Sequence, residues 1–485
     1  MPITAKSNFK IALVKIENYG RIFPLGLLYL GNSLKKAGYS VEVFNIFRNE
    51  IPAVAKQLIN MKPLFVGLSA YTGIQTRCTY EMSMALKELD RNIKVVWGGV
   101  HPTMLPEDCL KEDCVDIVCL GEGDELVVKL ADHLSQGGDL KELNSIGYKS
   151  GSDLIVNSDR HFISNLDDYE PDWTLLPDFE KCVRILPDGR REIDFATSRG
   201  CPNSCGFCYN LKFNGKRWRC HSYEYVIEKI SYLRDRYNIN AIYFNDINFF
   251  VDSERAFRIL EKLKEMDVSC LSCMLRIDAL NEETVKRLQN LGIKRLLVGM
   301  ESGSNRMLKL IDKKLTREQI LEKFNILSKF PNLGVTATSV IGFPTETWEE
   351  ICQTIDLGVR LAELVPDIIV TFPTFLPYPG SSLYELAVEG GFRLPKSIVD
   401  YASFDAYSNT MELTWIPWAN KNTKDIFYRI DKYGKLLRHS KGPNILRNLG
   451  KNLFYHLSRL RLKHRCFIFP WEIFRLFSKG GHSNE

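Results

Sequence analysis

Strand-like and helix-like stretches alternate in two series along this chain of 485 residues, and this alternation limits the folds open to it. The first series lies within residues 1–140. Strands alternating with helices predict an α/β fold with a doubly wound parallel sheet of the flavodoxin or Rossmann type. Ligands of such sheets bind beyond the carboxyl ends of the strands. Here those ends read "SAYTG", "GGVH" and "GEGD".

The second series follows a turn-rich linker at 141–192 and occupies residues 193–385. Its strands are expected at 194–199, 241–246, 270–276, 294–299, 334–341 and 367–375. Six β/α units predict a partial TIM barrel, (β/α)6, with its chemistry at the C-terminal ends of the strands. Residues 386–485 are expected to form a helical, basic C-terminal extension.

Composition narrows the class of protein. The chain is 45% apolar and 25% charged, as is typical of soluble globular proteins. We find no uncharged apolar run long enough to span a membrane and no signal-like start. Thirteen cysteines suit a reducing compartment, where cysteines serve as thiols or metal ligands. We therefore expect a cytoplasmic protein in which some cysteines bind metal.

The strongest metal-binding signal is the stretch "SRGCPNSCGFCYN". It spaces Cys201, Cys205 and Cys208 as C-x3-C-x2-C, directly after the first expected barrel strand. Iron–sulfur clusters usually take four cysteines, so three leave one iron open to a small molecule. The alternatives are a zinc site that lacks a fourth ligand, or three incidental thiols.

The cysteine spacing, the aromatic Phe207 and the position after a first barrel strand resemble the radical S-adenosylmethionine (SAM) superfamily. The resemblance implies that the three cysteines hold a [4Fe-4S] cluster, which binds SAM at its open iron. An electron from the reduced cluster then cleaves SAM to a 5′-deoxyadenosyl radical. It also implies oxygen sensitivity and an electron donor such as flavodoxin or ferredoxin.

Four later segments are similar to those with which this superfamily contacts SAM. The residues implied are Asp246 in "FNDINF", Arg276 in "MLRID", Glu301 in "VGMESGSNRML" and Gly342 in "VIGFPTET". A bidentate guanidinium at Arg276 suits the SAM carboxylate, but a surface ion pair with Asp278 is an equal alternative. For Glu301 the alternative is a helix start beside Ser302.

Residues 8–135 resemble the cobalamin-binding domain that precedes many radical SAM barrels, through "VGLSAYTG", "VVWGGVHPTMLPED" and "VDIVCLGEGD". The residues that would face the lower side of the corrin are Ser69, Tyr71 and Thr72. Those that would let the nucleotide tail lie along the backbone are Gly98, Gly99, Gly121 and Gly123. The pattern D-x-H-x-x-G is absent, so no histidine is expected to bind cobalt, and His101 is expected to be structural. Loss of cobalamin from a retained domain is an alternative.

The remaining cysteines and the tail are less specific. Buried structural thiols are expected at Cys270, Cys273, Cys109, Cys114 and Cys119. Residues 421–479 carry fifteen Lys and Arg against three Asp and Glu, a net charge of +12. Apolar residues recur there at helical spacing at Ile445, Leu449, Leu453, Leu457 and Leu460, and an aromatic run follows at 466–477. This helix either meets an anionic membrane surface or packs on the barrel. No module for reading nucleic acid is visible, so that partner is not expected.

The resemblance implies, as leading hypothesis, a cobalamin-dependent class B methyltransferase that methylates an unactivated carbon. One SAM would methylate cob(I)alamin and a second would supply the radical. The rival is radical cyclisation, rearrangement or C–C coupling of a lipid, tetrapyrrole or natural product, as in proteins like the anaerobic Mg-protoporphyrin ester cyclase. A non-catalytic cofactor carrier is a third hypothesis. The substrate is expected to be a small molecule or a lipid.

Overall fold

The computed structural model describes residues 6–18, 20, 22–404, 412–437 and 445–467, with only the backbone described for 445–452. The chain divides into two compact units. The first comprises Met1–Met274, Leu376–Val388 and Arg393–Met411, and the second Leu275–Phe375, Glu389–Phe392 and Glu412–Glu485. The first unit is thus assembled from segments that lie far apart in the sequence.

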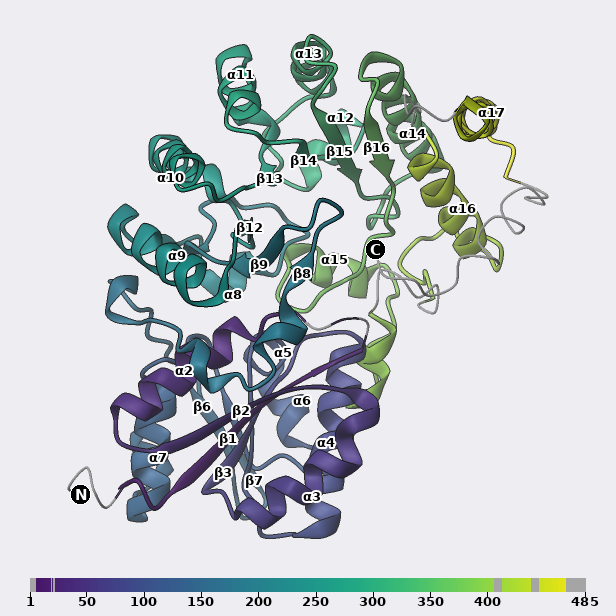
Figure 1. Cartoon of the computed structure of the whole chain (residues 1–485). Coiled ribbons are helices and arrows are strands. Elements are labelled where there is room, and N and C mark those ends of the chain that lie inside the picture. Colours follow the sequence, from purple (N-terminus) through teal and green to yellow (C-terminus); the bar gives the residue numbers. More distant parts are fainter. Residues whose placement is uncertain (1–5, 19, 21, 405–411, 438–444, 468–485) are drawn as a thin grey trace. The chain divides into compact units, whose positions relative to one another are not determined.

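A seven-stranded sheet forms the core of the N-terminal part of the first unit (Figure 1). Its strands are β1 (Lys10–Glu17), β2 (Ser40–Phe47), β3 (Phe65–Ser69), β4 (Val95–Gly98), β5 (Ile117–Cys119), β6 (Ile146–Ser150) and β7 (Asp153–Asn157), in the order β2-β1-β3-β4-β5-β6-β7. The first five are parallel, whereas β6 and β7 form an antiparallel hairpin on β5. The doubly wound sheet is confirmed, and part of the predicted linker proves to be its edge.

Helices cover both faces of this sheet. They are α2 (Leu25–Lys36), α3 (Ile51–Met61), α4 (Ile74–Leu89), α5 (Val100–Met104), α6 (Pro106–Leu110) and α7 (Leu126–Gln136). Figure 1 shows α2 and α7 on one face and α3 and α4 on the other. Coverage of both faces explains the nearly continuous apolar strands, in which Leu13, Val66 and Trp97 are buried. The polar loops after β3, β4 and β5 are therefore left at the carboxyl edge.

The rest of the first unit carries the start of the second series. Its elements are β8 (Arg184–Ile185), β9 (Arg191–Phe195), β10 (Ser198–Gly200), α8 (Asn210–Asn214), β11 (Trp218–Cys220), α9 (Tyr223–Tyr237), β12 (Ala241–Phe244), α10 (Ser253–Glu265), α15 (Ser382–Glu389) and the 3-10 helix η8 (Ile398–Ser403), and β13 (Ser272–Leu275) lies at its boundary. Strands β9 and β12 pair in parallel, and β10 and β11 form an antiparallel hairpin. The side chain of Ser222 caps α9 by accepting from the Tyr225 amide.

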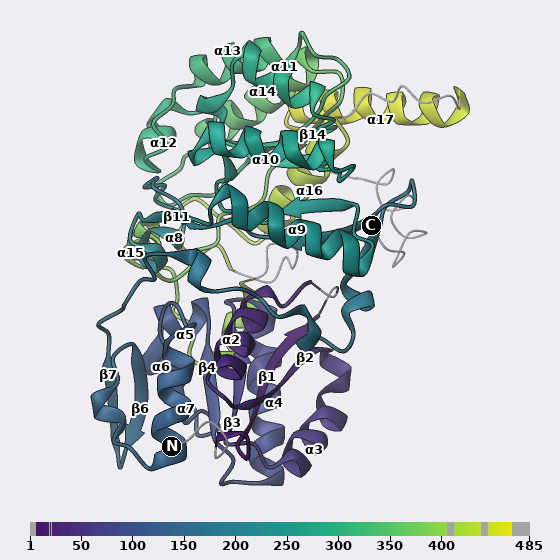
Figure 2. The same cartoon turned by 60° about the vertical axis from the view of Figure 1, so that its left-hand side comes forward.

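The second unit contains the later β/α repeats and the C-terminal helices. Its elements are α11 (Glu282–Asn290), β14 (Arg295–Glu301), α12 (Asn305–Leu310), α13 (Arg317–Leu327), β15 (Gly334–Ser339), α14 (Trp348–Leu364), β16 (Ile368–Thr371), α16 (Thr423–Lys435) and α17 (Ile445–Lys463). Strands β14, β15 and β16 are parallel, and α11, α13 and α14 lie in a row beside them (Figure 2). The second alternation and the helical extension are confirmed. None of the helices within the described residues has the length and apolar character needed to cross a bilayer.

The tail helix α17 does not pack through Leu453 and Leu460 of the predicted apolar stripe. The side chains of Ile445 and Leu449 and the run 468–477 lie outside what the structure describes. Leu453 and Leu460 are 58% and 53% exposed, whereas Tyr455, Ser458 and Leu462 are buried. The buried side of the described helix is therefore set by residues other than the predicted leucine stripe.

Candidate functional site

The cysteine loop begins at the end of β10, in a hairpin that only glycine permits. Gly200 has φ +88°, and a Cβ on it would lie 2.0 Å from the carbonyl oxygen of Arg217. A side chain there would force the two strands of the hairpin apart. The tight hairpin therefore fixes where the chain enters the loop at Cys201, which is buried.

Amides surround the first cysteine. Asn203 Nδ2 donates to Cys201 Sγ at 3.2 Å, and Asn248 Nδ2 lies 3.9 Å from the same sulfur. Hydrogen bonds to cysteine sulfurs are one way in which proteins tune iron–sulfur clusters. Within the described residues no three Cys, His, Asp or Glu side chains converge as they would on a single metal ion. A cubane does not need this, because each thiolate binds a different iron, and three thiols on one short loop fit that requirement.

Asp246 lies where the second strand of the series ends, but its carboxylate is already occupied. It accepts hydrogen bonds from the Thr197 amide (3.0 and 3.1 Å), the Thr197 hydroxyl (2.8 Å) and the Ser198 hydroxyl. Burial raises the pKa of Asp246, against the effect of these donors and of Arg255. The predicted contact of Asp246 with SAM stays a prediction, while the observed contacts give it a role in holding β10.

A C-terminal segment of the first unit closes over the cysteine loop. The Leu383 amide (3.0 Å) and the Ser382 hydroxyl (3.1 Å) both donate to the carbonyl of Gly206, which lies between Cys205 and Cys208. Gly380 has φ +86°, and a Cβ on it would lie 2.3 Å from Met104 Sδ. The segment that includes Gly380, Ser382 and Leu383 is thus packed between the cysteine loop and α5.

The carboxyl edge of the seven-stranded sheet presents the three residues predicted to face a corrin. Ser69 ends β3, the Tyr71 side chain is 41% exposed, and Thr72 Oγ1 shares a 3.0 Å hydrogen bond with His101 Nδ1. His101 is buried edge-on against Tyr401, with ring centroids 4.8 Å apart, and burial lowers its pKa to about 4. The ring is therefore neutral at pH 7, in keeping with a structural His101.

The four predicted glycines differ in what surrounds them. Gly98 has open space, since a Cβ there would meet nothing closer than 3.9 Å. A Cβ on Gly99 would lie 2.8 Å from Ala70 O, and one on Gly123 would lie 3.0 Å from Leu30. Gly121 (φ +79°) faces the Arg160 side chain at 3.3 Å. Packing and a φ of +104° thus already require Gly99, whereas at Gly123 only the end of the Leu30 side chain would have to move. The open Gly98 and the exposed Tyr71 fit a large flat cofactor.

Tyr209 connects this edge with the cysteine loop. Burial raises the pKa of its hydroxyl well above the usual value, with smaller contributions from the neighbouring Tyr71, Cys208 and Tyr378. The geometry agrees, because α5, which follows β4 at this edge, contacts α8, which follows the cysteine loop. The residues predicted for cobalamin and for the cluster come together in the first unit.

In the second unit, Glu301 forms a buried ion pair that the motif did not reveal. Glu301 Oε1 accepts from Lys313 Nζ at 2.8 Å, and both residues are buried. Gly299 makes room for this pair, since a Cβ there would lie 2.2 Å from Glu301 Oε1. Glu301 also has φ +62°, a backbone conformation rare outside glycine. The sequence does not reveal Lys313 as the partner of Glu301, because the pair forms only when the chain after α12 folds back onto the end of β14.

Arg276 and Gly342 are held by their own surroundings. Arg276 pairs with Asp278 at 2.9 Å, as the surface alternative predicts. Gly342 (φ +82°) packs against Phe427 and Ile416, and its carbonyl accepts from Trp415 Nε1 at 2.8 Å. The C-terminal extension therefore covers the "VIGFPTET" turn. Whether Arg276, Glu301 and Gly342 contact SAM stays a prediction.

Glu346 in the same turn is the most perturbed carboxylate of the second unit. Its Oε2 accepts from the amides of Gly342 (2.6 Å) and Phe343 (3.0 Å), while Oε1 is buried with no hydrogen-bond partner among the described residues. Burial raises its pKa to about 8. Glu346 lies within the "VIGFPTET" segment, in which the resemblance pointed to Gly342 alone.

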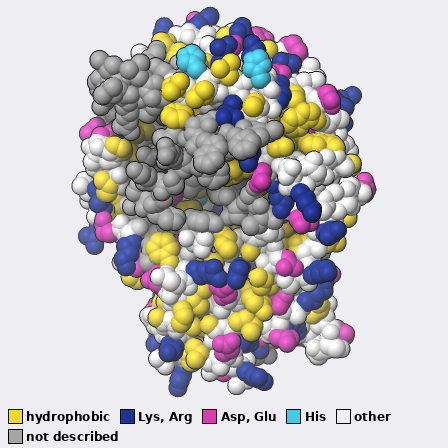
Figure 3. Space-filling view, turned by 90° about the vertical axis from the view of Figure 1, so that its right-hand side faces the viewer, with side chains coloured by type: hydrophobic (Ala, Val, Ile, Leu, Met, Phe, Trp, Pro, Cys, Tyr) yellow, Lys and Arg dark blue, Asp and Glu magenta, His cyan; other side chains and the backbone are white. Residues whose placement is uncertain are grey.

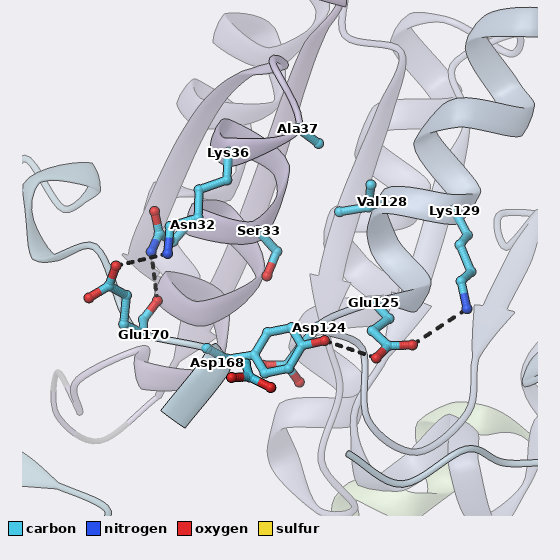
Figure 4. A pocket seen from close by; sticks show the side chains of 11 residues that line it. Asn32, Ser33, Lys36, Ala37, Asp124, Glu125, Val128, Lys129, Asp168 and Glu170 are labelled. Carbon is cyan, nitrogen blue, oxygen red and sulfur yellow. Dashed lines mark hydrogen bonds and ion pairs between the residues drawn. The ribbon is translucent and has the colours of Figure 1, made fainter. Parts of the chain in front are cut away.

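The other candidate features carry no cofactor site. Cys109, Cys114, Cys270 and Cys273 are buried, as expected of structural thiols, and burial raises the pKa of each. Cys119, at the end of β5, is only partly buried, so the prediction for it was wrong. A pocket of about 350 Å³ lies between α2, α7 and residues 168–170 (Figure 4). Its charges are largely paired with one another, Lys36 with Glu170 and Lys129 with Glu125.

Comparison with known proteins places the chain. Residues 195–358 match the model of the radical SAM superfamily, and residues 11–131 match that of the B12 binding domain. The uncharacterized methyltransferase PH0819 of Pyrococcus horikoshii is 33% identical over 389 residues, which cover 79% of this chain and 82% of that protein. The chain belongs to the radical SAM superfamily.

Further relatives of this radical SAM protein agree on the architecture. The anaerobic magnesium-protoporphyrin IX monomethyl ester cyclase of Rubrivivax gelatinosus is 26% identical over 374 residues, 75% of this chain and 66% of that protein. The methyltransferase TsrM of Kitasatospora setae, solved with cobalamin and a [4Fe-4S] cluster, has a TM-score of 0.64 at 14% identity and covers 93% of this chain and 99% of its own. The cobalamin-dependent enzyme OxsB gives 0.65 at 17% identity, over 93% and 72% of the two chains.

Membership fixes the cofactors. A radical SAM enzyme uses a [4Fe-4S] cluster and SAM, and the B12-binding domain adds cobalamin. The donors described above fit both metal cofactors, with three thiols on one loop and an open edge at Gly98 and Tyr71. Zinc and incidental thiols are no longer needed as explanations.

Proposed function

We propose that this radical SAM enzyme is a cobalamin-dependent methyltransferase that acts on an unactivated carbon of a small molecule. The observation that carries the proposal is the contact between α5, which follows β4 at the corrin edge, and α8, which follows the cluster loop. A Cβ on Gly380 would meet both elements, at Met104 Sδ of α5 (2.3 Å) and at Lys212 of α8 (3.3 Å). A radical generator and a methyl carrier are useful to one reaction only when they lie close together. The 33% identical relative named as a methyltransferase supports the same reaction.

Within this proposal each group of residues has one task. Together the bound cofactors supply a carbon-centred radical and a transferable methyl group. Cys201, Cys205 and Cys208 hold the cluster, and the Phe207 side chain flanks the last of them. Ser69, Tyr71 and Thr72 support the lower face of the corrin, with Thr72 anchored by His101. In the second unit we assign Arg276 and Glu301 to the polar end of SAM and Gly342 to its adenine.

Labelled SAM tests the reaction. Anaerobic protein with a full cluster and bound corrin is incubated with reductant and SAM that carries a ¹³C-methyl group. Formation of 5′-deoxyadenosine and transfer of label to cobalamin support the proposal, and absence of both contradicts it. Cys205→Ala should abolish both signals and lower the iron content. The matched control Cys273→Ala, at a buried thiol outside the loop, should retain both.

Cyclisation or rearrangement without methyl transfer is the second candidate, favoured by the 26% identical magnesium-protoporphyrin ester cyclase. The same incubation separates the two, because this candidate predicts 5′-deoxyadenosine with no methylated cobalamin. Bound corrin alone does not separate them. Transfer of the labelled methyl group to a product would exclude cyclisation or rearrangement without methyl transfer.

We further propose that an acidic electron donor of the flavodoxin or ferredoxin type docks beside the cluster loop. Lys212, Lys216 and Arg217 are exposed there, Arg160 donates to the Lys212 carbonyl, and no described carboxylate forms an ion pair with any of the four. Arg217 O packs against Gly200, the residue before Cys201. Opposite charges accelerate the encounter of proteins. Lys212→Glu with Lys216→Glu should slow turnover with reduced flavodoxin but not with dithionite, and Lys56→Glu on α3 should change neither.

We also propose a peripheral contact of α17 with anionic lipid, supported by Leu453 and Leu460, which are exposed on a basic helix. Figure 3 shows basic, acidic and hydrophobic side chains mixed over the side of the molecule that faces the viewer. Sedimentation with phosphatidylglycerol vesicles tests the contact. Leu453→Glu with Leu460→Glu should abolish binding, and Leu394→Glu, an exposed leucine of the first unit, should not. Equal sedimentation with neutral vesicles would contradict the proposal.

A further inference from the structure

Two carboxylates of the cobalamin-binding domain form ion pairs with the β10–β11 hairpin, which leads into the cysteine loop and which we name the cluster hairpin. Asp124, in the loop that follows β5, accepts from both terminal nitrogens of Arg199 at 2.8 and 2.9 Å. Glu122 accepts from both terminal nitrogens of Arg219 at 2.8 Å. We name these four residues the hairpin clasp. It uses the "GEGD" loop, which the sequence assigned to the cobalamin tail through its glycines alone.

The clasp is matched to the register of the hairpin. Arg199 of β10 and Arg219 of β11 are directly paired across the two strands. Like charges at such positions repel one another and destabilise a hairpin. Two carboxylates spaced two residues apart cancel both charges, and Glu122 also lies 3.6 Å from Arg199. The positive charges of Arg199 and Arg219 are therefore neutralised only when the loop that carries Glu122 and Asp124 is in place.

Burial makes the geometry of the clasp stringent. The side chains of Asp124 and Glu122 are only 4% and 6% exposed. Removing one member of a buried ion pair strands the other charge, which is strongly unfavourable. Bidentate arginine–carboxylate pairs also fix orientation as well as distance, because both groups are planar. Arg219 is tied further to the Ile163 carbonyl at 2.7 Å.

Arg199 of the hairpin clasp lies close in sequence to the first cluster ligand. Arg199 is separated from Cys201 by one residue, Gly200, whose backbone is held against Arg217. A displacement of Arg199 is therefore passed on to the first cluster ligand. Errors of about 1 Å in positioning reacting groups can cost about a hundredfold in rate.

We propose that Glu122 and Asp124 are positioning residues, which set the distance and orientation of the cluster relative to the cobalt of bound cobalamin. This inference rests on the proposed function, because it requires both cofactors in one enzyme. It assigns to the acidic side chains a task that neither cofactor-binding motif implies. The loop after β5 then serves the cobalamin-binding sheet with its backbone and the cluster hairpin with its carboxylates.

Magnetic coupling tests the proposal without reference to turnover. The reduced cluster and cob(II)alamin are both paramagnetic, so pulsed EPR of the loaded enzyme reports their separation. Asp124→Asn and Glu122→Gln should broaden or shift the distance distribution while iron and corrin content stay near the wild-type values. Arg217→Gln, beside the same hairpin and without an ion pair to any carboxylate that the structure describes, is the matched control and should leave the distance distribution unchanged. Unchanged coupling in both acid variants would overturn the proposal.

Two further arms cover the ways in which this measurement could fail. If the single variants do not fold, Glu122→Gln combined with Arg219→Gln removes both charges of one pair and leaves none stranded. If wild-type protein binds no corrin, the proposed function fails, and hydrogen exchange on cluster-loaded protein tests the clasp by itself. Amides of residues 198–200 and 218–220 should then exchange at least about tenfold faster in Asp124→Asn, whereas those of α3 should not change. Equal exchange would show that the clasp does not hold the hairpin.

Discussion

Asp246 and Glu301 end strands of the same β/α series, yet the two units satisfy these carboxylates in different ways. Asp246 in the first unit is surrounded by neutral donors, the amide and hydroxyl of Thr197 and the hydroxyl of Ser198. Glu301 in the second unit meets one cation, Lys313, through one oxygen. The first arrangement concentrates its donors on Oδ1 of the carboxylate, whereas among the described residues Oδ2 accepts only from the Thr197 amide that it shares with Oδ1. The second leaves capacity for a ligand, at a residue whose backbone is already in an uncommon conformation.

The difference teaches that equal motif positions are not equal sites. A carboxylate bound by neutral donors builds structure, because each donor would be left unsatisfied without it. A carboxylate bound by one buried lysine through one oxygen can still accept a second cationic group, such as the amino group of a ligand, at its other oxygen. We therefore expect Asp246 to affect stability and Glu301 to affect stability and SAM binding together.

The largest effect is expected for Glu301→Ala. The change strands the Lys313 ammonium in a buried position, and breaking a buried pair costs about 3–5 kcal/mol of unfolding free energy. Anaerobic urea unfolding measures this loss, and equilibrium dialysis measures SAM binding, which should fall with it. Glu301→Gln with Lys313→Met should recover most of the stability but not the SAM binding. Full SAM binding in that double variant would remove Glu301 from the SAM site.

Asp246→Asn comes next. The amide keeps one acceptor oxygen but turns its NH2 group toward the Thr197 and Ser198 donors, at a cost of about 1–3 kcal/mol. Urea unfolding of the cluster-free protein should show this loss. SAM affinity per intact cluster tests the predicted contact of Asp246 with SAM. A loss of affinity beyond the loss of stability would support that contact, and an unchanged affinity would leave Asp246 with a structural role alone. Asp159→Asn, at an exposed carboxylate, provides the control for stability.

Glu346, a third buried carboxylate, should make the free energy of unfolding depend on pH. Its pKa is raised from 4.5 to about 8 in the folded protein, so between these values the folded state holds a proton that the unfolded state has released. The free energy of unfolding therefore falls as pH rises through this window, by up to about 1.4 kcal/mol per pH unit from this group. Glu346→Gln keeps the shape and should flatten that slope in urea unfolding at pH 5, 6, 7 and 8. A variant with the wild-type slope would contradict the shift.

The smallest effect is expected for Asp278→Asn. Asp278 is 47% exposed in its pair with Arg276, and exposed pairs contribute about 0–1 kcal/mol. The free energy of unfolding, measured in urea, should fall by no more than about 1 kcal/mol. If Arg276 binds the SAM carboxylate, removal of its competitor should leave SAM affinity equal or higher. A clear fall in affinity would assign the contact to Asp278.

The fold was largely predictable because its determinants are local. Apolar strands such as 10–16 and 65–72 lie between helices with apolar faces, and parallel pairing follows from that alternation. The turn-rich stretch at 141–192 is compatible with a small hairpin, and β6 and β7 form one. Its pairing with β5 was not predictable, since that pairing depends on contacts outside the hairpin's own sequence. The same limit explains the tail, where Tyr455 and Leu462 are buried in place of Leu453 and Leu460.

For the site, the sequence supplied the ligands but not their partners. Cys201, Cys205 and Cys208 are recognisable because three ligands must share one loop. Lys313 lies twelve residues from Glu301, and Asp124 lies seventy-five from Arg199. Such partners are set by tertiary structure, so no spacing in the sequence reveals them. Glu346 was missed for another reason, because its raised pKa arises from burial under the C-terminal extension, where Trp418 reaches its carbonyl.

The closure of the cysteine loop by Leu383 and Ser382 has a consequence for how the enzyme is made. All three cysteines leave the ribosome well before residue 382, and domains generally fold as their segments emerge. Until that segment arrives, the carbonyl of Gly206 lacks both of its donors and the thiols lie on an unfinished loop. The loop therefore reaches its final hydrogen bonding only after residues 382 and 383 have been synthesised.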